Sequence, residues 1–361
     1  MPPSPATANG LPRDDAKWRM GIPVRPVLLS EKGRARVPIL RKPSLMQEPS
    51  LLLRIAMFHF SGGDGYLCGL LLFCLAQIGL IFNRNDRWRR PLTIASRIGL
   101  IWAFVLPSPT PRWLLVLFAA SLLWLCIADW RLKSASDPSV RSRQVQMARS
   151  LSWLVIVLAF LIVLCEVPYR FSPTIEASSY RLCIAADSVT AGLNDGEDTW
   201  PQRLARDSLW RITDASQPGA TLKSARQQVN LVDAESSILL LEIGGNDLLE
   251  GLPVAQFERD LELLLMAARL PGRLVLMFEL PLPPLAFRYG EAQRRLAYKY
   301  EIALIPKRLL IGVLTSSGAT VDGIHLSPNG HARMADLVKK LLGNEGHPRQ
   351  EAGSYQHVGP R

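Results

Sequence analysis

The chain has 361 residues, 48% of them hydrophobic, and a formal net charge of +11 at pH 7. The charge is unevenly distributed: residues 1–167 carry 21 Lys and Arg against 9 Asp and Glu, whereas residues 168–361 carry 21 against 22. A nucleic-acid-binding protein would hold its basic surplus on a folded recognition domain. Here the surplus lies between long apolar runs, which argues against a nucleic-acid partner and indicates a membrane protein.

Residues 1–50 are rich in Pro, Arg and Lys and show no apolar periodicity, so they are predicted to form a disordered arm. They lack the apolar core followed by a small-residue cleavage site that a cleavable signal peptide needs. Translation from Met46 or Met57 would remove most of the arm, and the sequence leaves both starts open.

Residues 51–167 are predicted to form a transmembrane region of four or five helical segments, because roughly 20 apolar residues cross a hydrocarbon core of about 30 Å. The strong segments are residues 66–83, 113–128 and 151–167. A weaker run over 92–107 carries Arg97 and is expected to form a hairpin with 113–128. Residues 51–60 are too short to span and are interpreted as a re-entrant or fifth segment.

Two basic stretches, residues 84–90 and 131–149, separate the apolar segments and are predicted to be cytoplasmic by the positive-inside rule. With four spans, the polar C-terminal half emerges on the extracytoplasmic face, which is periplasmic in a bacterium with two membranes. The basic arm then lies on that face too, against the same rule. The chain is thus predicted to be a multi-pass integral membrane protein.

From Pro168 onward, short apolar runs alternate with amphipathic ones. Residues 168–345 are predicted to form one folded domain, followed by a disordered tail over 346–361. The predicted strands are residues 180–185, 209–213, 237–243 and 273–280. The predicted helices are residues 200–208, 221–229, 253–270 and 291–304. Near-continuous apolar strands separated by helices indicate a parallel sheet covered on both faces, a three-layer α/β domain.

Polar residues follow the ends of the predicted strands, where functional side chains of a parallel sheet collect. Ser188 follows the first strand in "AADSVTAGL", Gly219 lies in "QPGATL" after the second, and Asn246 lies in "GGND" after the third. Asp322 and His325 lie three residues apart in "DGIHLSPNGH", ahead of the last helix. A lone serine there would be ordinary turn chemistry. The four loops together indicate one site.

In this order, over about residues 178–343, the four blocks resemble the SGNH (GDSL-type) hydrolases. The resemblance implies a flavodoxin-like sandwich and ester hydrolysis or acyl transfer, with no metal or nucleotide cofactor. One position departs from the family pattern, because Ala186 replaces the glycine that usually precedes the Asp-Ser pair. If this position requires φ > 0, alanine would strain the loop by the order of 1 kcal/mol. We expect altered loop packing without loss of activity.

The resemblance also implies a role for each residue of the set. Ser188 would be the nucleophile and His325 its general base, because imidazole titrates near neutral pH. Asp322 would hold the imidazole in the required tautomer and stabilise the imidazolium. The oxyanion hole would consist of the Ser188 N–H, the Gly219 N–H and the Asn246 side-chain amide.

Other residues near these blocks have a structural interpretation beside the functional one. Trp200 and the loop over 281–290 would either line an acyl or sugar pocket or serve as packing and lid residues. His331 is interpreted as a helix-start residue. Asp247 is expected to cap its loop, and Asp187 to shape the turn beside the serine.

These observations predict a membrane-anchored serine hydrolase that cleaves an acyl or acetyl ester of an envelope glycan or lipid. One alternative is an O-acyltransferase that uses the same Ser188, Asp322 and His325 to acylate envelope hydroxyls. Another is a non-catalytic binding module, which the intact catalytic set argues against. The hydrolase and the acyltransferase differ in the acyl acceptor, which is water in the first and a sugar hydroxyl in the second. The sequence favours no oligomeric state.

Overall fold

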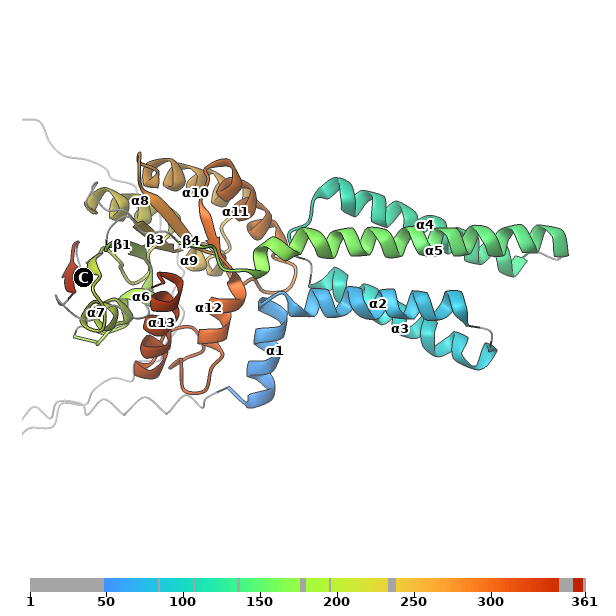
Figure 1. The fold of residues 1–361 in the computed structure, drawn as a ribbon, viewed down its shortest axis with the longest axis horizontal. Coiled ribbons are helices and arrows are strands. Elements are labelled where there is room, and N and C mark those ends of the chain that lie inside the picture. Colours follow the sequence, from blue (N-terminus) through green and yellow to red (C-terminus); the bar gives the residue numbers. More distant parts are fainter. Residues whose placement is uncertain are drawn as a thin grey trace, which may run out of the picture. The chain divides into compact units, whose positions relative to one another are not determined.

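The computed structural model describes residues 49–361 with short gaps. The gaps are residues 84, 107, 135–136, 176–179, 195, 233–237, 344–352 and 360–361. Almost all of the predicted N-terminal arm, including the possible start at Met46, therefore lies outside the described residues. The described chain begins with helices and continues into an α/β domain (Figure 1).

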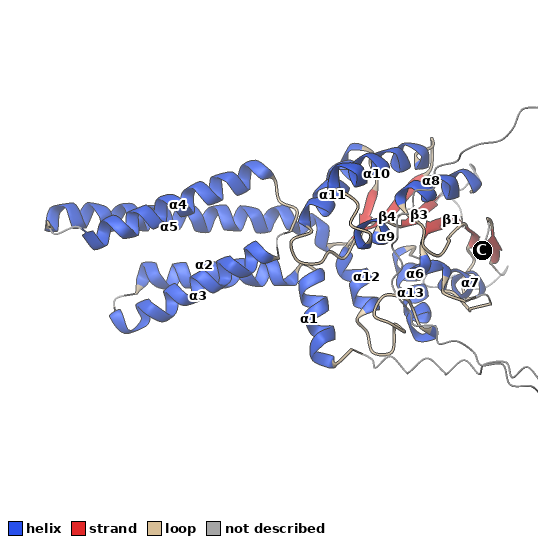
Figure 2. Ribbon diagram, turned by 180° about the vertical axis from the view of Figure 1, so that it is seen from behind, coloured by secondary structure: helices blue, strands red, loops and turns tan. Residues whose placement is uncertain are grey.

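A parallel sheet of six strands forms the centre of the C-terminal domain (Figure 2). In spatial order the strands run β5-β4-β3-β1-β2-β6, and every pairing between neighbours is parallel. The strands are β1 (Arg181–Ala186), β2 (Arg211–Asp214), β3 (Ile238–Glu242), β4 (Leu274–Phe278), β5 (Ala303–Ile305) and β6 (Ser354–His357). The central strands of the sheet are buried on both faces. The sequence of β3 is therefore the continuous apolar run "ILLL" before its terminal glutamate.

Helices cover both faces of this sheet. One face holds α8 (Leu222–Leu231), α10 (Val254–Ala268) and α11 (Phe287–Lys299). The other holds α7 (Trp200–Arg206), α12 (Lys307–Leu314) and α13 (Pro328–Leu341). Along β3, Leu239 and Leu241 pack into the first core, whereas Ile238 and Leu240 pack into the second, as the two-residue period of a strand requires. The predicted three-layer α/β fold is confirmed.

The four predicted strands are all present, and two short ones were not predicted. The single helix expected over 291–304 ends at Lys299, the chain turns at Glu301 with φ 54°, and β5 follows. The disordered tail expected over 346–361 is wrong at Ser354–His357, which pair with β2 as β6. β5 has only three residues and β6 reads "SYQH", so neither presents an apolar run that the sequence could reveal.

In the described part of the chain, five α-helices precede the α/β domain: α1 (Leu51–Ser61), α2 (Asp64–Phe82), α3 (Asp86–Val105), α4 (Arg112–Ser134) and α5 (Pro138–Glu166). Within the described residues, three segments are long and apolar enough to cross a membrane, namely Asp64–Phe82, Arg112–Leu132 and Pro138–Arg170. The basic stretch 131–149, expected to separate two apolar segments, is largely helical. Asp137 caps α5, whose first turn begins with proline, so only residues 135–137 separate α4 from α5.

The helices pair as α2 with α3 and α4 with α5. The expected hairpin of 92–107 with 113–128 is therefore wrong. Glycines explain the observed pairing: a Cβ at Gly99 would lie 2.6 Å from the Phe73 nitrogen, and one at Gly69 would lie 2.7 Å from the Ala103 nitrogen. Small residues at these positions let the two backbones approach closely, as in membrane helix pairs generally.

A buried guanidinium joins the end of α5 to the α/β domain. Arg294 on α11 forms two hydrogen bonds with Glu166, of 2.7 and 2.8 Å, and one of 2.6 Å with Glu279, which follows β4. Its Cζ lies 3.7 Å from the centre of the Tyr169 ring. Lys307 is also buried and interacts electrostatically with both carboxylates, and its backbone N–H donates a hydrogen bond of 3.4 Å to Glu279. Burial would lower the pKa of Arg294, but the two carboxylates raise it, so the guanidinium stays charged.

We expect Arg294→Met to destabilise the full chain by about 3–5 kcal/mol, because it leaves two buried carboxylates without their partner. Chemical unfolding in detergent micelles measures the loss. The matched control is Arg295→Met at the next position, where an exposed arginine pairs with Glu258. Exposed pairs contribute about 0–1 kcal/mol, so the control should unfold almost as the wild type does. Equal, small effects of both substitutions would show that the buried cluster does not hold the structure together.

Candidate active site

Ser188 lies directly beyond the carboxyl end of β1, as the first residue of the short helix α6 (Ser188–Ala191). Asp187 caps this helix, because its Oδ1 accepts a hydrogen bond of 2.9 Å from the Val189 N–H. Ala186 is the last residue of β1 and fully buried, and it is not among the described non-glycine residues with positive φ. Alanine therefore fits this position without the strain considered from the sequence.

His325 reaches Ser188 from a loop 137 residues further along the chain. Its Nε2 lies 3.0 Å from the Ser188 Oγ, and its Nδ1 lies 2.6 Å from Oδ2 of Asp322. The other carboxylate oxygen of Asp322 accepts hydrogen bonds from the backbone N–H of His325 and of Ile324, at 2.8 and 3.0 Å. Asp322 thus fixes both the imidazole and the loop that carries it.

Several hydrogen bonds to Asp322 keep it ionised. Its partial burial would raise the pKa, but the His325 side chain and the two backbone N–H groups together lower it. A carboxylate beside Nδ1 favours the tautomer in which Nδ1 carries the proton and Nε2 is free to accept one from Ser188. The structure thus brings the predicted serine together with the histidine and aspartate of a second, distant loop.

The two other predicted site residues lie on loops at the same sheet edge. Gly219 has φ 72°, and a Cβ there would meet nothing within 4 Å, so the space above its backbone is open. Asn246 lies on α9 (Gly245–Leu249), and its Nδ2 donates a hydrogen bond of 2.8 Å to the Ala220 carbonyl. Asp247 accepts 2.9 Å from the Leu222 N–H at the start of α8. The loops after β2 and β3 are therefore bonded to each other.

Comparison with known proteins places these loops in one family. A model of the GDSL-like lipase/acylhydrolase family matches residues 187–333. The esterase TesA of Pseudomonas aeruginosa is 32% identical over 183 residues, which cover 47% of this chain and 90% of that protein. The chain belongs to the GDSL-like lipase/acylhydrolase family. It is therefore a hydrolase that acts on ester bonds, and the resemblance inferred from the four blocks is confirmed.

Other relatives of this hydrolase match the same region. The thioesterase 1/protease 1/lysophospholipase L1 of Escherichia coli K12 is 28% identical over 178 residues, covering 46% of this chain and 85% of that protein. The crystal structure of TesA is 30% identical, covers 45% of this chain and 97% of that structure, and gives a TM-score of 0.38. The SGNH-hydrolase family esterase AlinE4 is 22% identical, with coverages of 47% and 97% and a TM-score of 0.35.

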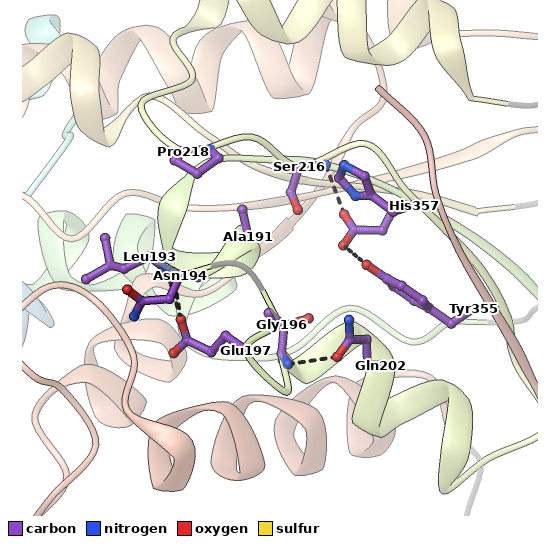
Figure 3. Close-up of a pocket in the computed structure, with 13 residues that line it drawn as sticks. Ala191, Leu193, Asn194, Gly196, Glu197, Gln202, Ser216, Pro218, Tyr355 and His357 are labelled. Atoms are coloured by element: carbon purple, nitrogen blue, oxygen red, sulfur yellow. Dashed lines mark hydrogen bonds between the residues drawn. The ribbon is translucent and has the colours of Figure 1, made fainter. Parts of the chain in front are cut away.

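A small pocket of the hydrolase lies beside the Ser188 helix, between the loop after α6 and the end of β2 (Figure 3). Asp214, the last residue of β2, accepts hydrogen bonds there from the Ser216 N–H at 2.9 Å and from the Tyr355 hydroxyl at 3.1 Å. Tyr355 and His357 of β6 complete one wall.

The described residues contain no cluster of three or more His, Cys, Asp or Glu side chains that could hold a metal.

A buried polar network connects the short helix of Ser188 to β3, α7 and α13. The sequence did not indicate this network. Glu242, the last residue of β3, accepts a hydrogen bond of 3.1 Å from the Thr190 hydroxyl. The Thr190 oxygen in turn accepts a hydrogen bond of 3.1 Å from the Trp200 indole N–H. The Trp200 backbone N–H donates 3.2 Å to Nδ1 of His331. Trp200 and His331 are fully buried, so Trp200 is a packing residue and His331 does more than start a helix.

Asp187 and Glu242 form a buried carboxyl pair within this network. Burial raises the pKa of Asp187 to about 6, although hydrogen bonds from Val189 and Glu242 oppose the rise. Burial, and then the negative charge of Asp187, raises the pKa of Glu242 well above its usual range. Both carboxyls therefore favour the protonated form more strongly than exposed carboxyls do. The sequence signal for this pair was the glutamate that ends the otherwise apolar strand β3.

Both carboxyls bind protons more tightly in the folded chain than in the unfolded one. The stability they contribute is full below the usual carboxyl pKa of about 4, and it is lost as pH rises through about 6 for Asp187 and through a higher range for Glu242. Glu242→Gln keeps a donor toward Asp187 and an acceptor for Thr190 but removes one titrating group. We expect its melting temperature to decline less from pH 5 to 9, with the variant more stable than the wild type at pH 9. Scanning fluorimetry of the full chain measures this.

The control for this experiment is Glu250→Gln, which replaces an exposed carboxyl at the end of α9. Its melting curve against pH should follow that of the wild type. Parallel curves for Glu242→Gln and the wild type would contradict the raised pKa of Glu242.

Proposed function

We propose that this hydrolase is anchored in a membrane and cleaves an acyl or acetyl ester of an envelope glycan or lipid through Ser188, His325 and Asp322. The observation that carries the proposal is the continuous chain of contacts from the Ser188 Oγ through His325 to Asp322, with separations of 3.0 and 2.6 Å. These are the distances at which a base accepts a proton and a carboxylate orients the base.

The proposed chemistry proceeds in two steps. Ser188 Oγ attacks the ester carbonyl while His325 takes its proton, and the imidazolium then protonates the departing alcohol as the C–O bond breaks. Water attacks the resulting acyl-serine in the same manner and releases the acid. The N–H groups of Ser188 and Gly219 and the amide of Asn246 would stabilise the oxyanion, and the open space above Gly219 leaves room for the substrate.

A fluorophosphonate probe should label the full wild-type chain and fail to label Ser188→Ala. Ester turnover should fall by the order of 10⁴-fold or more, because the members of a catalytic triad act as a unit. The matched control is Ser216→Ala, which removes another buried serine at the carboxyl edge of the sheet. It should be labelled like the wild type. Labelling of Ser188→Ala to the same extent would contradict the assignment of the nucleophile.

The membrane part of the proposal rests on the long helices. The spans Asp64–Phe82, Arg112–Leu132 and Pro138–Arg170 have mean hydropathies of 2.1, 2.0 and 2.5. At 20 residues α3 is about 30 Å long, so it would complete a bundle of four crossings despite its arginines. The 11-residue α1 is too short to be a further span.

The proposed orientation follows from an ion pair. Arg170, just after α5, pairs with Asp64 at the start of α2, so these two helix ends lie together beside the α/β domain. The opposite ends hold the basic residues of 84–90 and 131–149, which the positive-inside rule assigns to the cytoplasm. The hydrolase domain is then extracytoplasmic and faces envelope esters.

A topology reporter that is active only outside the cytoplasm provides the test. Fused after Pro168 it should be active, and inserted at position 136, between α4 and α5, it should be silent. The basic residues near position 136 are the reason for the expected difference. Immunoblots of both fusions control for expression. The reverse pattern would place the hydrolase on the cytoplasmic face and remove envelope esters as substrates.

A further inference from the structure

Helix α1 (Leu51–Ser61) exposes aliphatic side chains that a surface helix of a water-soluble domain would bury. Arg54 and Met57 line a small pocket against Leu314, Thr320 and Gly323 of the hydrolase domain. Four aliphatic side chains instead point outward, each more than half exposed: Leu51, Leu52, Leu53 and Ile55. A helix in contact with water turns its apolar stripe to the core. The outer side of α1 is therefore suited to an apolar surrounding.

The position of α1 relative to the proposed spans indicates which surrounding this is. Gly63, with φ 86°, joins α1 to α2, and α1 runs across the direction of α2 (Figure 1). Arg170, just after the end of α5, donates 3.2 Å to the Gly62 carbonyl and pairs with Asp64 at the start of α2. The turn therefore lies level with the ends of two spans, where the hydrocarbon core meets the headgroups.

We propose that α1 is a membrane-surface helix whose outward leucines and isoleucine insert into the lipid interface, holding the catalytic loop of Asp322 and His325 at the bilayer surface. The inference rests on the membrane anchoring proposed above. Its partner is the lipid bilayer. The outer side of α1 adjoins the bilayer because α1 leads directly into α2, a proposed span. The preceding segment, residues 1–50, carries nine Lys and Arg against four Asp and Glu, a balance that suits anionic headgroups.

The other side of α1 connects this surface to the site. The Phe58 ring lies 3.7 Å from where a Cβ of Gly312 on α12 would be, and the pocket shared with Arg54 is bounded by Thr320 and Gly323. Those two residues flank Asp322. Val321 and Ile324, beside the catalytic pair, are apolar and exposed. The site is thereby presented to esters held in or on the same bilayer leaflet.

Photo-cross-linking of the full chain in proteoliposomes tests the placement of α1. Benzoylphenylalanine replaces Leu52 or, in a second variant, Ile55, which are 80% and 56% exposed. The vesicles contain phosphatidylcholine and phosphatidylglycerol with a clickable acyl chain. Leu75 on α2, 57% exposed, is the membrane control, and Tyr298 on α11, 89% exposed, is the water control. All variants carry Ser188→Ala, so no lipid is hydrolysed during irradiation.

We expect positions 52 and 55 to form lipid adducts to the same extent as position 75, with none at position 298. Adducts at 75 but not at 52 and 55 would overturn the proposal for α1 and leave the membrane anchor standing. Cross-linked dimers at 52 and 55 without lipid would overturn it in favour of a second copy of the chain. Loss of adducts at 75 would overturn both, whereas the proposed chemistry is judged separately by fluorophosphonate labelling.

Discussion

The pairing of Arg294 with two buried carboxylates is the interaction on which the arrangement of this protein depends. Glu166 ends the last long helix, and Glu279 follows β4 at the carboxyl edge of the sheet. Ser188 lies at the same edge, because β4, β3 and β1 are parallel neighbours. The guanidinium therefore attaches the helical bundle to the edge of the sheet that carries the candidate site.

The candidate site lies at the switch point of the strand order, between β1 and β3. From β1 the chain moves to β2 on one side and then returns to β3 on the other, so the loops after β1 and β3 diverge at this point. Such a switch leaves a crevice at the carboxyl ends of the strands. Ser188 and Asn246 lie on its two sides. The Asp187 N–H donates a hydrogen bond of 3.1 Å to the Glu242 carbonyl, which joins the ends of these two strands.

Sequence reasoning found those parts of the site whose signals are local. Ser188, Gly219 and Asn246 each follow an apolar run, and Asp322 and His325 share one short motif, so their convergence followed from parallel topology. Arg294 was missed because "EAQRRLAYKY" is typical of a solvated helix, and its partner Glu166 is 128 residues away. The α2–α3 pairing was missed for a similar reason, since it depends on close backbone contact at glycines.

The attachment of the α/β domain to the end of α5 limits how far the serine can move from the proposed membrane anchor. Residues 167–180 link the two elements, and the Arg294 cluster holds the domain against the end of α5. In the proposed setting, Ser188 is kept at one height above the bilayer. Encounters with substrate would then depend on lateral diffusion within a thin layer, and the rate would follow the surface density of esters and not their bulk concentration.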